Sequence, residues 1–203
     1  MKIICIGLNY ASHLEEFNSQ RPEEPVIFFK PDSAILRDNK PFYIPDFTQQ
    51  LEHEVELVVR INRLGKNISE RFAHRYYDSV ALGIDLTARD LQRAARAVGH
   101  PWALSKGFDG SAVLSEFVPV SETQGINAIH FRLLKNGEPV QEGFSGDMLF
   151  KVDQLIAYIS KYISLKIGDL IYTGTPCGVG KLAIGDHLEG YIEDQKLIDF
   201  YIK

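Results

Sequence analysis

The sequence of this 203-residue chain has few cysteines, no long apolar run and no excess of basic residues. It has only two cysteines, too few for a disulfide framework, which favours a reduced compartment. No apolar run approaches the roughly 20 residues that a membrane-spanning helix needs. Lys and Arg number 22 against 27 Asp and Glu, so no basic surface is expected for a nucleic acid. We therefore expect a cytoplasmic protein that binds neither nucleic acids nor membranes.

The segments that are present are mostly strand-like. Apolar residues make up 45% of the chain and charged residues 24%, as in ordinary globular proteins, and residues 1–203 are expected to form one domain. An Asn-Gly pair at 136–137 predicts a tight hairpin turn. Strands are expected over 2–8, 23–31, 51–61, 80–86, 112–120, 128–143 and 185–202.

Helical patterns are few and scattered. Residues 68–80 have helical spacing behind a possible cap at Ser69, and 152–163 read as a helix. Thr87 and Asp90 resemble a capping box that opens a helix over 88–98. Because helices do not alternate with strands, we predict an α+β fold that is mostly β, with a mixed, mainly antiparallel architecture and flanking helices.

Glu54 and Glu56 lie in the strand predicted over 51–61 and raise the question of a metal site. Residues two apart on a strand share a face, and adjacent carboxylates repel unless a cation such as Mg²⁺ joins them. A half-solvated outer face is the alternative, and the pair alone favours it. Asp85 changes the balance, because it lies in an apolar strand where a charge needs a partner. It would complete a Glu, Glu, Asp ligand set.

His13 and Glu16 are three residues apart and share a face on a helical turn. A carboxylate can orient a neutral imidazole and raise its basicity, which suits a general base acting on water. For an isolated pair, an ordinary surface helix is the better interpretation. Glu15 is also near in sequence, but a residue two positions on faces away.

Two lysines and a glycine-rich stretch leave alternatives open. Lys30 and Lys106 could each bind a substrate carboxylate or an enolate oxygen, or lie on the surface as lysines usually do. The stretch "YTGTPCGVGK" fails as a phosphate loop, since Thr175 occupies the first glycine position. Its backbone could hold a carboxylate or simply link strands. Cys177 within it is a possible reactive thiol, whereas Cys5 is expected in the core.

Taken together, the motifs resemble one known family. "GLNYASH", "FFKP", "HEVEL", "GIDLTARDLQ", "PWALSKGFD", "NGEPVQEG" and "GDLIYTGTPCGVG" follow in this order. This series resembles the fumarylacetoacetate hydrolase family in its short form, over essentially residues 1–190. The resemblance implies a β roll or sandwich with peripheral helices, and a homodimer.

The resemblance also implies the roles of the candidate residues. A Mg²⁺ or Mn²⁺ ion would be held by Glu54, Glu56 and Asp85, and His13 with Glu16 would activate water. Lys106 would lie at the oxygens bound to the metal. The implied substrate-binding residues are Lys30, Gln92 and Thr175. Two departures are visible: Leu8 replaces a basic residue of some relatives, and "DGSAVLSEF" differs from the Pro/Gly-rich family version.

These expectations lead to a hypothesis about function. We predict a divalent-metal-dependent hydrolase that cleaves a C–C bond in acylpyruvate-type 2-oxo acids through an enolate stabilised by the cation. The same site would suit oxaloacetate decarboxylation or tautomerisation, or isomerisation of an unsaturated dicarboxylate such as 2-hydroxyhepta-2,4-diene-1,7-dioate. A non-catalytic metabolite-binding protein is a further alternative, which the complete set of site residues disfavours.

Overall fold

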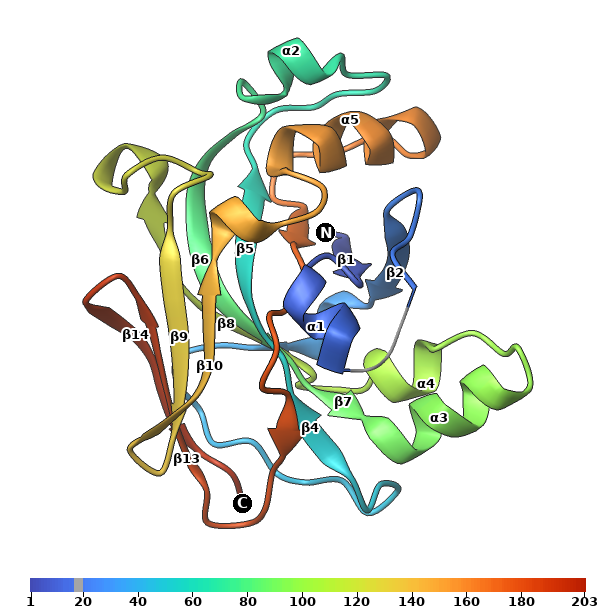
Figure 1. Cartoon of the computed structure of the whole chain (residues 1–203), viewed down its shortest axis with the longest axis vertical. Coiled ribbons are helices and arrows are strands. Elements are labelled where there is room, and N and C mark those ends of the chain that lie inside the picture. Colours follow the sequence, from blue (N-terminus) through green and yellow to red (C-terminus); the bar gives the residue numbers. More distant parts are fainter. Residues whose placement is uncertain (17–19) are drawn as a thin grey trace.

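The computed structural model describes residues 1–16 and 20–203, and strands predominate in it (Figure 1). The helices are α1 (Ala11–Glu16), α2 (Glu70–Ala73), α3 (Arg89–Ala97), α4 (Ala103–Lys106) and α5 (Val152–Tyr162). The strands are β1 (Ile3–Gly7), β2 (Val26–Lys30), β3 (Ile35–Leu36), β4 (Leu51–His53), β5 (Val55–Ile61), β6 (Tyr77–Asp85), β7 (Thr87–Ala88), β8 (Ala112–Pro119), β9 (His130–Lys135), β10 (Glu138–Phe144), β11 (Leu170–Tyr172), β12 (Gly180–Lys181), β13 (His187–Ile192) and β14 (Gln195–Tyr201). The predicted class, α+β and mostly β, is confirmed.

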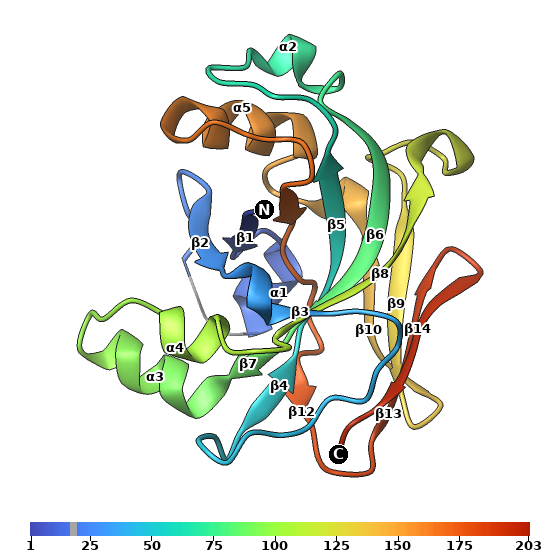
Figure 2. The same cartoon turned by 180° about the vertical axis from the view of Figure 1, so that it is seen from behind.

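The strands form three sheets. The largest has the order β2-β1-β11-β5-β6-β8-β3, and it is mixed because β1 runs parallel to β11 and β3 parallel to β8. A four-stranded antiparallel sheet, β10-β9-β13-β14, packs against one side of it, and a short sheet joins β12, β4 and β7. Figure 2 shows the four-stranded sheet on one side of β5 and β6, with α1, α3 and α4 on the other side. In the described part of the chain, no helix has the length and apolar character needed to span a membrane.

The long strand β5 is buried on both faces. Leu57 and Val59 belong to the large core between the two main sheets, whereas Val58 packs in a second cluster on the opposite face with Cys5 and Tyr172. Because side chains alternate along a strand, Glu54 and Glu56 share the face of Val58. That face lies beneath the helices, so the half-solvated interpretation of the two glutamates is wrong.

Two predicted elements have different bounds from those expected. The strand predicted over 51–61 is divided into β4 and β5 at Glu54. The helix predicted over 68–80 is wrong beyond its first turn, because α2 ends at Ala73 and β6 begins at Tyr77. Tyr77 and Val80 pair with β5 instead. Tertiary pairing of aromatic and β-branched residues thus overrides the helical spacing.

The helix predicted over 88–98 is present as α3, but the predicted capping box is wrong. The Thr87 hydroxyl lies 3.2 Å from a Glu54 carboxylate oxygen and 2.6 Å from Lys106 Nζ rather than capping the helix. The Asp90 carboxylate accepts hydrogen bonds from Thr48 Oγ1 and the backbone of Gln49. Thr87 therefore serves the charged cluster described below. The predicted turn at 136–137 is confirmed by positive φ angles of 56° and 85°.

Candidate active site

Three carboxylates at the paired ends of β5 and β6 meet beneath α3 and α4: Glu54 directly before β5, Glu56 in β5 and Asp85 at the end of β6. Strand β5 pairs with β6 so that Val55 lies opposite Ile84, and the Asp85 N–H donates to the Glu54 carbonyl at 2.8 Å. This register brings Asp85 beside Glu54 and Glu56. One ligand atom from each of the three lies within 4.8 Å of the others, and all three side chains are buried. The structure thus brings together the three carboxylates that the sequence singled out.

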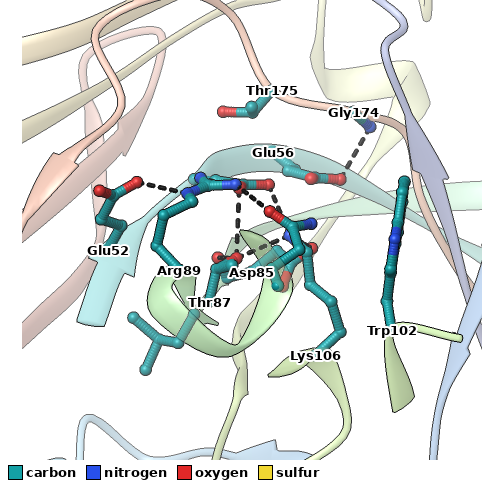
Figure 3. A network of polar contacts seen from close by, with 12 residues as sticks. Glu52, Glu56, Asp85, Thr87, Arg89, Trp102, Lys106, Gly174 and Thr175 are labelled. Carbon is teal, nitrogen blue, oxygen red and sulfur yellow. Dashed lines mark hydrogen bonds and ion pairs between the residues drawn. The ribbon is translucent and has the colours of Figure 1, made fainter. Parts of the chain in front are cut away.

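Two buried lysines neutralise part of this acidic triad. Lys106 Nζ lies 2.9 Å from Glu54 Oε2, 2.8 Å from Asp85 Oδ2 and 2.6 Å from Thr87 Oγ1, which uses its three N–H groups. Burial favours its neutral form, but Asp85 and Glu54 outweigh that effect and raise the pKa of Lys106. Lys30 Nζ lies 2.7 Å from Asp85 Oδ1. Figure 3 shows how Lys106 rises from α4 toward the carboxylates.

Arg89 is a member of the cluster that the sequence interpretation did not single out. Its Nε lies 2.6 Å from Glu52 Oε2, and its Nη2 lies 2.5 Å from Glu54 Oε1. It also donates to the Gln92 side-chain oxygen. Burial raises the pKa of Glu54, but Lys106, Arg89 and His13 overcome that effect and hold the pKa well below its ordinary value. The sequence does contain a signal for this role of Arg89. A basic residue in the first turn of a helix is unfavourable unless acidic side chains lie beside it.

Glu56 has the least compensated charge of the three carboxylates. Its Oε2 accepts a hydrogen bond of 2.7 Å from the Gly174 N–H (Figure 3). Burial, together with Asp85 and Glu54, raises the pKa of Glu56 well above its ordinary value. At Gly174 φ is 101°, and a Cβ would lie 2.7 Å from Asn9 Cβ, so glycine is required for this approach.

The acidic triad fits a divalent metal ion. Its donors are carboxylate oxygens, the ligand type that Mg²⁺ and Mn²⁺ prefer. The raised pKa of Glu56 shows that one negative charge in the cluster is poorly matched, and a cation bound there would remove that cost. Glu54, Glu56 and Asp85 are therefore the residues that would hold the ion.

A cavity of about 200 Å³ opens above the triad. Most of its polar lining comes from the middle of the chain, with His13 and Thr175 added from the two ends, and its apolar lining comes from β1 with the residue after it, β2 and the segment before α4. Glu54 and Glu56 contribute from below, and Lys106 lies beside them. The complete lining is Ile6, Gly7, Leu8, His13, Val26, Phe28, Glu54, Glu56, Arg89, Gln92, Arg96, Trp102, Lys106 and Thr175.

His13 lines this cavity and is paired with Glu16 on α1. His13 Nδ1 is 3.5 Å from Glu16 Oε2, and His13 is 8% exposed. Burial lowers the pKa of His13, and the opposing effects of Glu54 and Glu16 do not restore it. The imidazole is therefore neutral at neutral pH and can accept a proton. The Glu16 carboxylate also accepts hydrogen bonds of 3.1 and 3.2 Å from the Gly178 N–H, which joins α1 to the glycine-rich loop.

The remaining predicted residues differ in their access to the cavity. Gln92 and Thr175 line it, and the Thr175 hydroxyl donates to the Val55 carbonyl at 2.8 Å. Lys30 lies behind Asp85, where it also contacts Ser111 Oγ at 3.0 Å, and it is not among the described lining residues. Cys177 is exposed and Cys5 is buried. Lys30 is thus placed to orient Asp85 rather than to contact a substrate.

A model of one known protein family matches almost the whole sequence. The model of the fumarylacetoacetate (FAA) hydrolase C-terminal region matches residues 2–201. The chain belongs to the fumarylacetoacetate hydrolase family. The family resemblance predicted from the ordered motifs is confirmed.

Members of this family with similar sequences are named enzymes. The chain is 40% identical over 201 residues to the mitochondrial oxaloacetate tautomerase FAHD1 of Mus musculus, covering 99% of this chain and 91% of the relative. It is 42% identical over 188 residues to the oxaloacetate tautomerase YcgM of Escherichia coli (strain K12), covering 92% and 86%. The crystal structure of fumarylpyruvate hydrolase from Pseudomonas aeruginosa in complex with Mn²⁺ and pyruvate matches with a TM-score of 0.94 at 30% identity, covering 100% of this chain and 89% of that one. This chain is therefore an enzyme of the fumarylacetoacetate hydrolase family.

Proposed function

We propose that this enzyme interconverts the enol and keto forms of oxaloacetate, with Mg²⁺ or Mn²⁺ as its cofactor. The observation that carries the proposal is one cavity lined by Glu54 and Glu56 of the acidic triad and by a histidine paired with a glutamate. The sequence alone placed C–C bond hydrolysis first. The names of relatives at 40% and 42% identity support tautomerisation as the first candidate.

The cofactor and the protein have separate tasks in this proposal. A divalent cation supplies a Lewis acid for the carboxylate and 2-oxo oxygens of a bound 2-oxo acid. Lys30 and Lys106 hold Asp85 and Glu54 in place and offset the repulsion among the carboxylates. Ile6, Phe28 and Trp102 exclude water from one wall of the cavity, which strengthens electrostatic interactions inside it.

His13 is the proposed proton carrier. A proton on Nδ1, beside Glu16, leaves Nε2 as the basic nitrogen of the neutral ring. That nitrogen accepts a proton from carbon 3 of the keto form, the enolate oxygen takes a proton from solvent, and the imidazolium then releases its proton to solvent. In the enol-to-keto direction the ring first takes a proton from solvent and gives it to carbon 3, while the enol oxygen loses its proton to solvent, so that atoms and charge balance. Glu16 stabilises the imidazolium that forms between the two steps.

C–C bond hydrolysis is a second candidate, and the His13–Glu16 pair favours it. The same neutral imidazole can deprotonate a water molecule, and the resulting hydroxide adds to the distal carbonyl of an acylpyruvate. Breaking the C–C bond then gives pyruvate and a carboxylic acid. The fumarylpyruvate hydrolase of similar structure supports this candidate.

Two assays on the same protein separate these candidates. Decay of enol-oxaloacetate is followed by ultraviolet absorbance, and pyruvate release from fumarylpyruvate and acetylpyruvate is followed by coupling to lactate dehydrogenase. We expect enol decay faster than with Mg²⁺ alone, lost in EDTA and restored by added Mg²⁺. Decay no faster than the protein-free rate would exclude the tautomerase, and pyruvate release without enol decay would make hydrolysis the main activity.

We also propose that the enzyme is a homodimer. Phe29 on β2 is 47% exposed and Tyr162 on α5 is 64% exposed. Strand β2 is at the edge of the large sheet, with β1 as its only neighbour among the described strands. Such an apolar edge suits a second copy of the chain. Light scattering after size-exclusion chromatography measures the mass, and a mass of one chain would refute the dimer.

A further inference from the structure

The cavity has one cationic side chain that the cluster below it does not engage. Three cations line the cavity, and two of them are paired: Lys106 with Glu54 and Asp85, and Arg89 with Glu52 and Glu54. Arg96 is the third. The Arg96 guanidinium makes no hydrogen bond or ion pair with the described side chains of residues 1–14, 16 and 20–203. Its positive charge is available to a ligand.

The position of Arg96 follows from the geometry of α3. Arg89, Gln92 and Arg96 are spaced by three and four residues, so they lie on one face of the helix. All three line the cavity. Arg96 lies about 10 Å further along the helix axis than Arg89, because an α-helix rises about 1.5 Å per residue. Arg89 is at the buried end of this face, and Arg96 is exposed at its outer end.

The opposite wall of the cavity is apolar. Leu8, Val26, Phe28 and Trp102 supply it, and none of these side chains carries a charge. Figure 3 shows Trp102 on the other side of Lys106 from Arg89. Such a wall suits the carbon chain of a ligand and lowers the local dielectric constant. A charge pair formed beside this wall is stronger than one in bulk water.

We propose that Arg96 binds the second carboxylate of a 2-oxo dicarboxylate substrate, and so makes the cavity selective for dicarboxylates over monocarboxylates. The inference rests on the proposed function, in which the first carboxylate and the 2-oxo oxygen occupy the acidic end of the cavity. The length of the ligand runs along α3 from that end toward Arg96. Oxaloacetate and fumarylpyruvate both carry a second carboxylate, whereas acetylpyruvate does not.

A matched pair of non-hydrolysable ligands tests the inference by binding alone. 2-Oxoglutarate and 2-oxopentanoate have the same number of carbons and differ in the distal carboxylate. Isothermal titration in Mg²⁺ is expected to show tighter binding of 2-oxoglutarate to the wild type. Arg96→Gln is expected to weaken that binding about 5- to 10-fold, the range for a charged hydrogen bond at a partly exposed site, and to leave 2-oxopentanoate unchanged. Arg96→Lys should recover part of the loss.

Arg93→Gln is the control variant. Arg93 is an exposed arginine of the same helix, hydrogen-bonded to Gln50 outside the cavity, so its loss changes the net charge equally. In kinetics, Arg96→Gln is expected to raise KM for oxaloacetate with kcat retained, and Arg93→Gln to change neither.

The outcomes separate this inference from the proposed function. If neither 2-oxo acid binds the wild type in Mg²⁺, the proposed function fails and the inference fails with it. If both bind with equal affinity, or if Arg96→Gln weakens both equally, only the inference fails. An Arg93→Gln effect as large as that of Arg96→Gln would also overturn it, because the selectivity would then come from overall charge.

Discussion

Two groups of ion pairs in this enzyme have similar distances but different surroundings. The buried cluster beneath α3 joins Lys30, Lys106 and Arg89 to Glu52, Glu54 and Asp85 at 2.5–2.9 Å. The surface cluster on β13 and β14 joins Lys196 and His187 to Glu189 and Asp199 at 2.6–3.1 Å. Each includes or adjoins a histidine–carboxylate pair, His13–Glu16 in one case and His187–Asp199 in the other.

The difference between the two clusters is access to water. Asp85 and Lys30 have no exposed side-chain surface, whereas Asp199 and Lys196 have 41% and 43%. Exposed pairs are screened and contribute little, but a buried charge that loses its partner is costly. Burying these ion pairs therefore adds little net stability. It does fix the carboxylates at positions where a metal ion and a substrate could bind them. Distance alone does not distinguish a functional cluster from an incidental one.

The comparison is tested most strongly by removing one charge from each cluster. Asp85→Asn leaves Lys30 and Lys106 short of a buried partner, and it is expected to lower the free energy of unfolding by about 3–5 kcal/mol. It should also abolish the increase in melting temperature that the proposed metal site predicts for the wild type in Mg²⁺. Urea unfolding and thermal melting with and without Mg²⁺ measure the two effects. Asp199→Asn is the matched control, with no resolvable change expected. Equal destabilisation by the two variants would contradict the comparison.

The two histidines give a second contrast, in activity. His13→Ala is expected to lower kcat for oxaloacetate tautomerisation about 10²- to 10⁴-fold, the usual contribution of a positioned general base. The melting shift expected with Mg²⁺ and oxalate should remain, since His13 is not among the proposed metal ligands. His187→Ala removes the histidine of the surface pair, which stacks on Tyr201 and is not among the described residues that line the cavity, and should leave kcat unchanged. Full activity in His13→Ala would exclude His13 as the proton carrier.

The buried cluster also shows how far sequence reasoning reaches. Glu54, Glu56 and Asp85 could be predicted because carboxylates in apolar strands need a common partner, and ordered motifs identified the family. Thr87 was assigned to the helix because local spacing resembles a capping box, whereas its hydroxyl serves Glu54 and Lys106. Such contacts join residues that are 19 and 33 positions apart, and local patterns do not report them.

Lys30 and Arg89 illustrate the same limit at the site itself. The sequence shows Lys30 after an apolar run, but it does not show that the side chain forms an ion pair with Asp85. Arg89 looked like an ordinary helix residue, and only the arrangement of β4 beside β7 brings Glu52 to it. The kinds of residue that form the site could therefore be predicted from the sequence. The ion-pair partner of each charged side chain could not, because it depends on how distant strands and helices pack.

A third test compares two glutamates that each form an ion pair with a basic side chain. Glu52→Gln removes the charge beside Arg89 but keeps an acceptor, so we expect a loss of about 1–2 kcal/mol in the free energy of unfolding. Glu189→Gln makes the same change beside Lys196 on the surface, where a smaller loss is expected. Urea unfolding of both variants under identical conditions measures the difference. A larger loss for Glu189→Gln would show that burial does not set the strength of these pairs.

The smallest expected effect is a shift in one surface pKa. Hydrogen bonds from Lys196 and His187 hold the pKa of Asp199 below its ordinary value of 3.8. A lowered pKa means that Asp199 stabilises the folded state above pH 3.8 and loses this contribution as the pH falls through its folded-state pKa. Lys196→Met removes the larger of the two hydrogen-bonding causes, so the pKa of Asp199 should rise toward 3.8, as measured by NMR titration of the carboxyl carbon. An unchanged titration curve would mean that His187 alone orders this carboxylate, and that the surface cluster, unlike the buried one, does not act as a connected group.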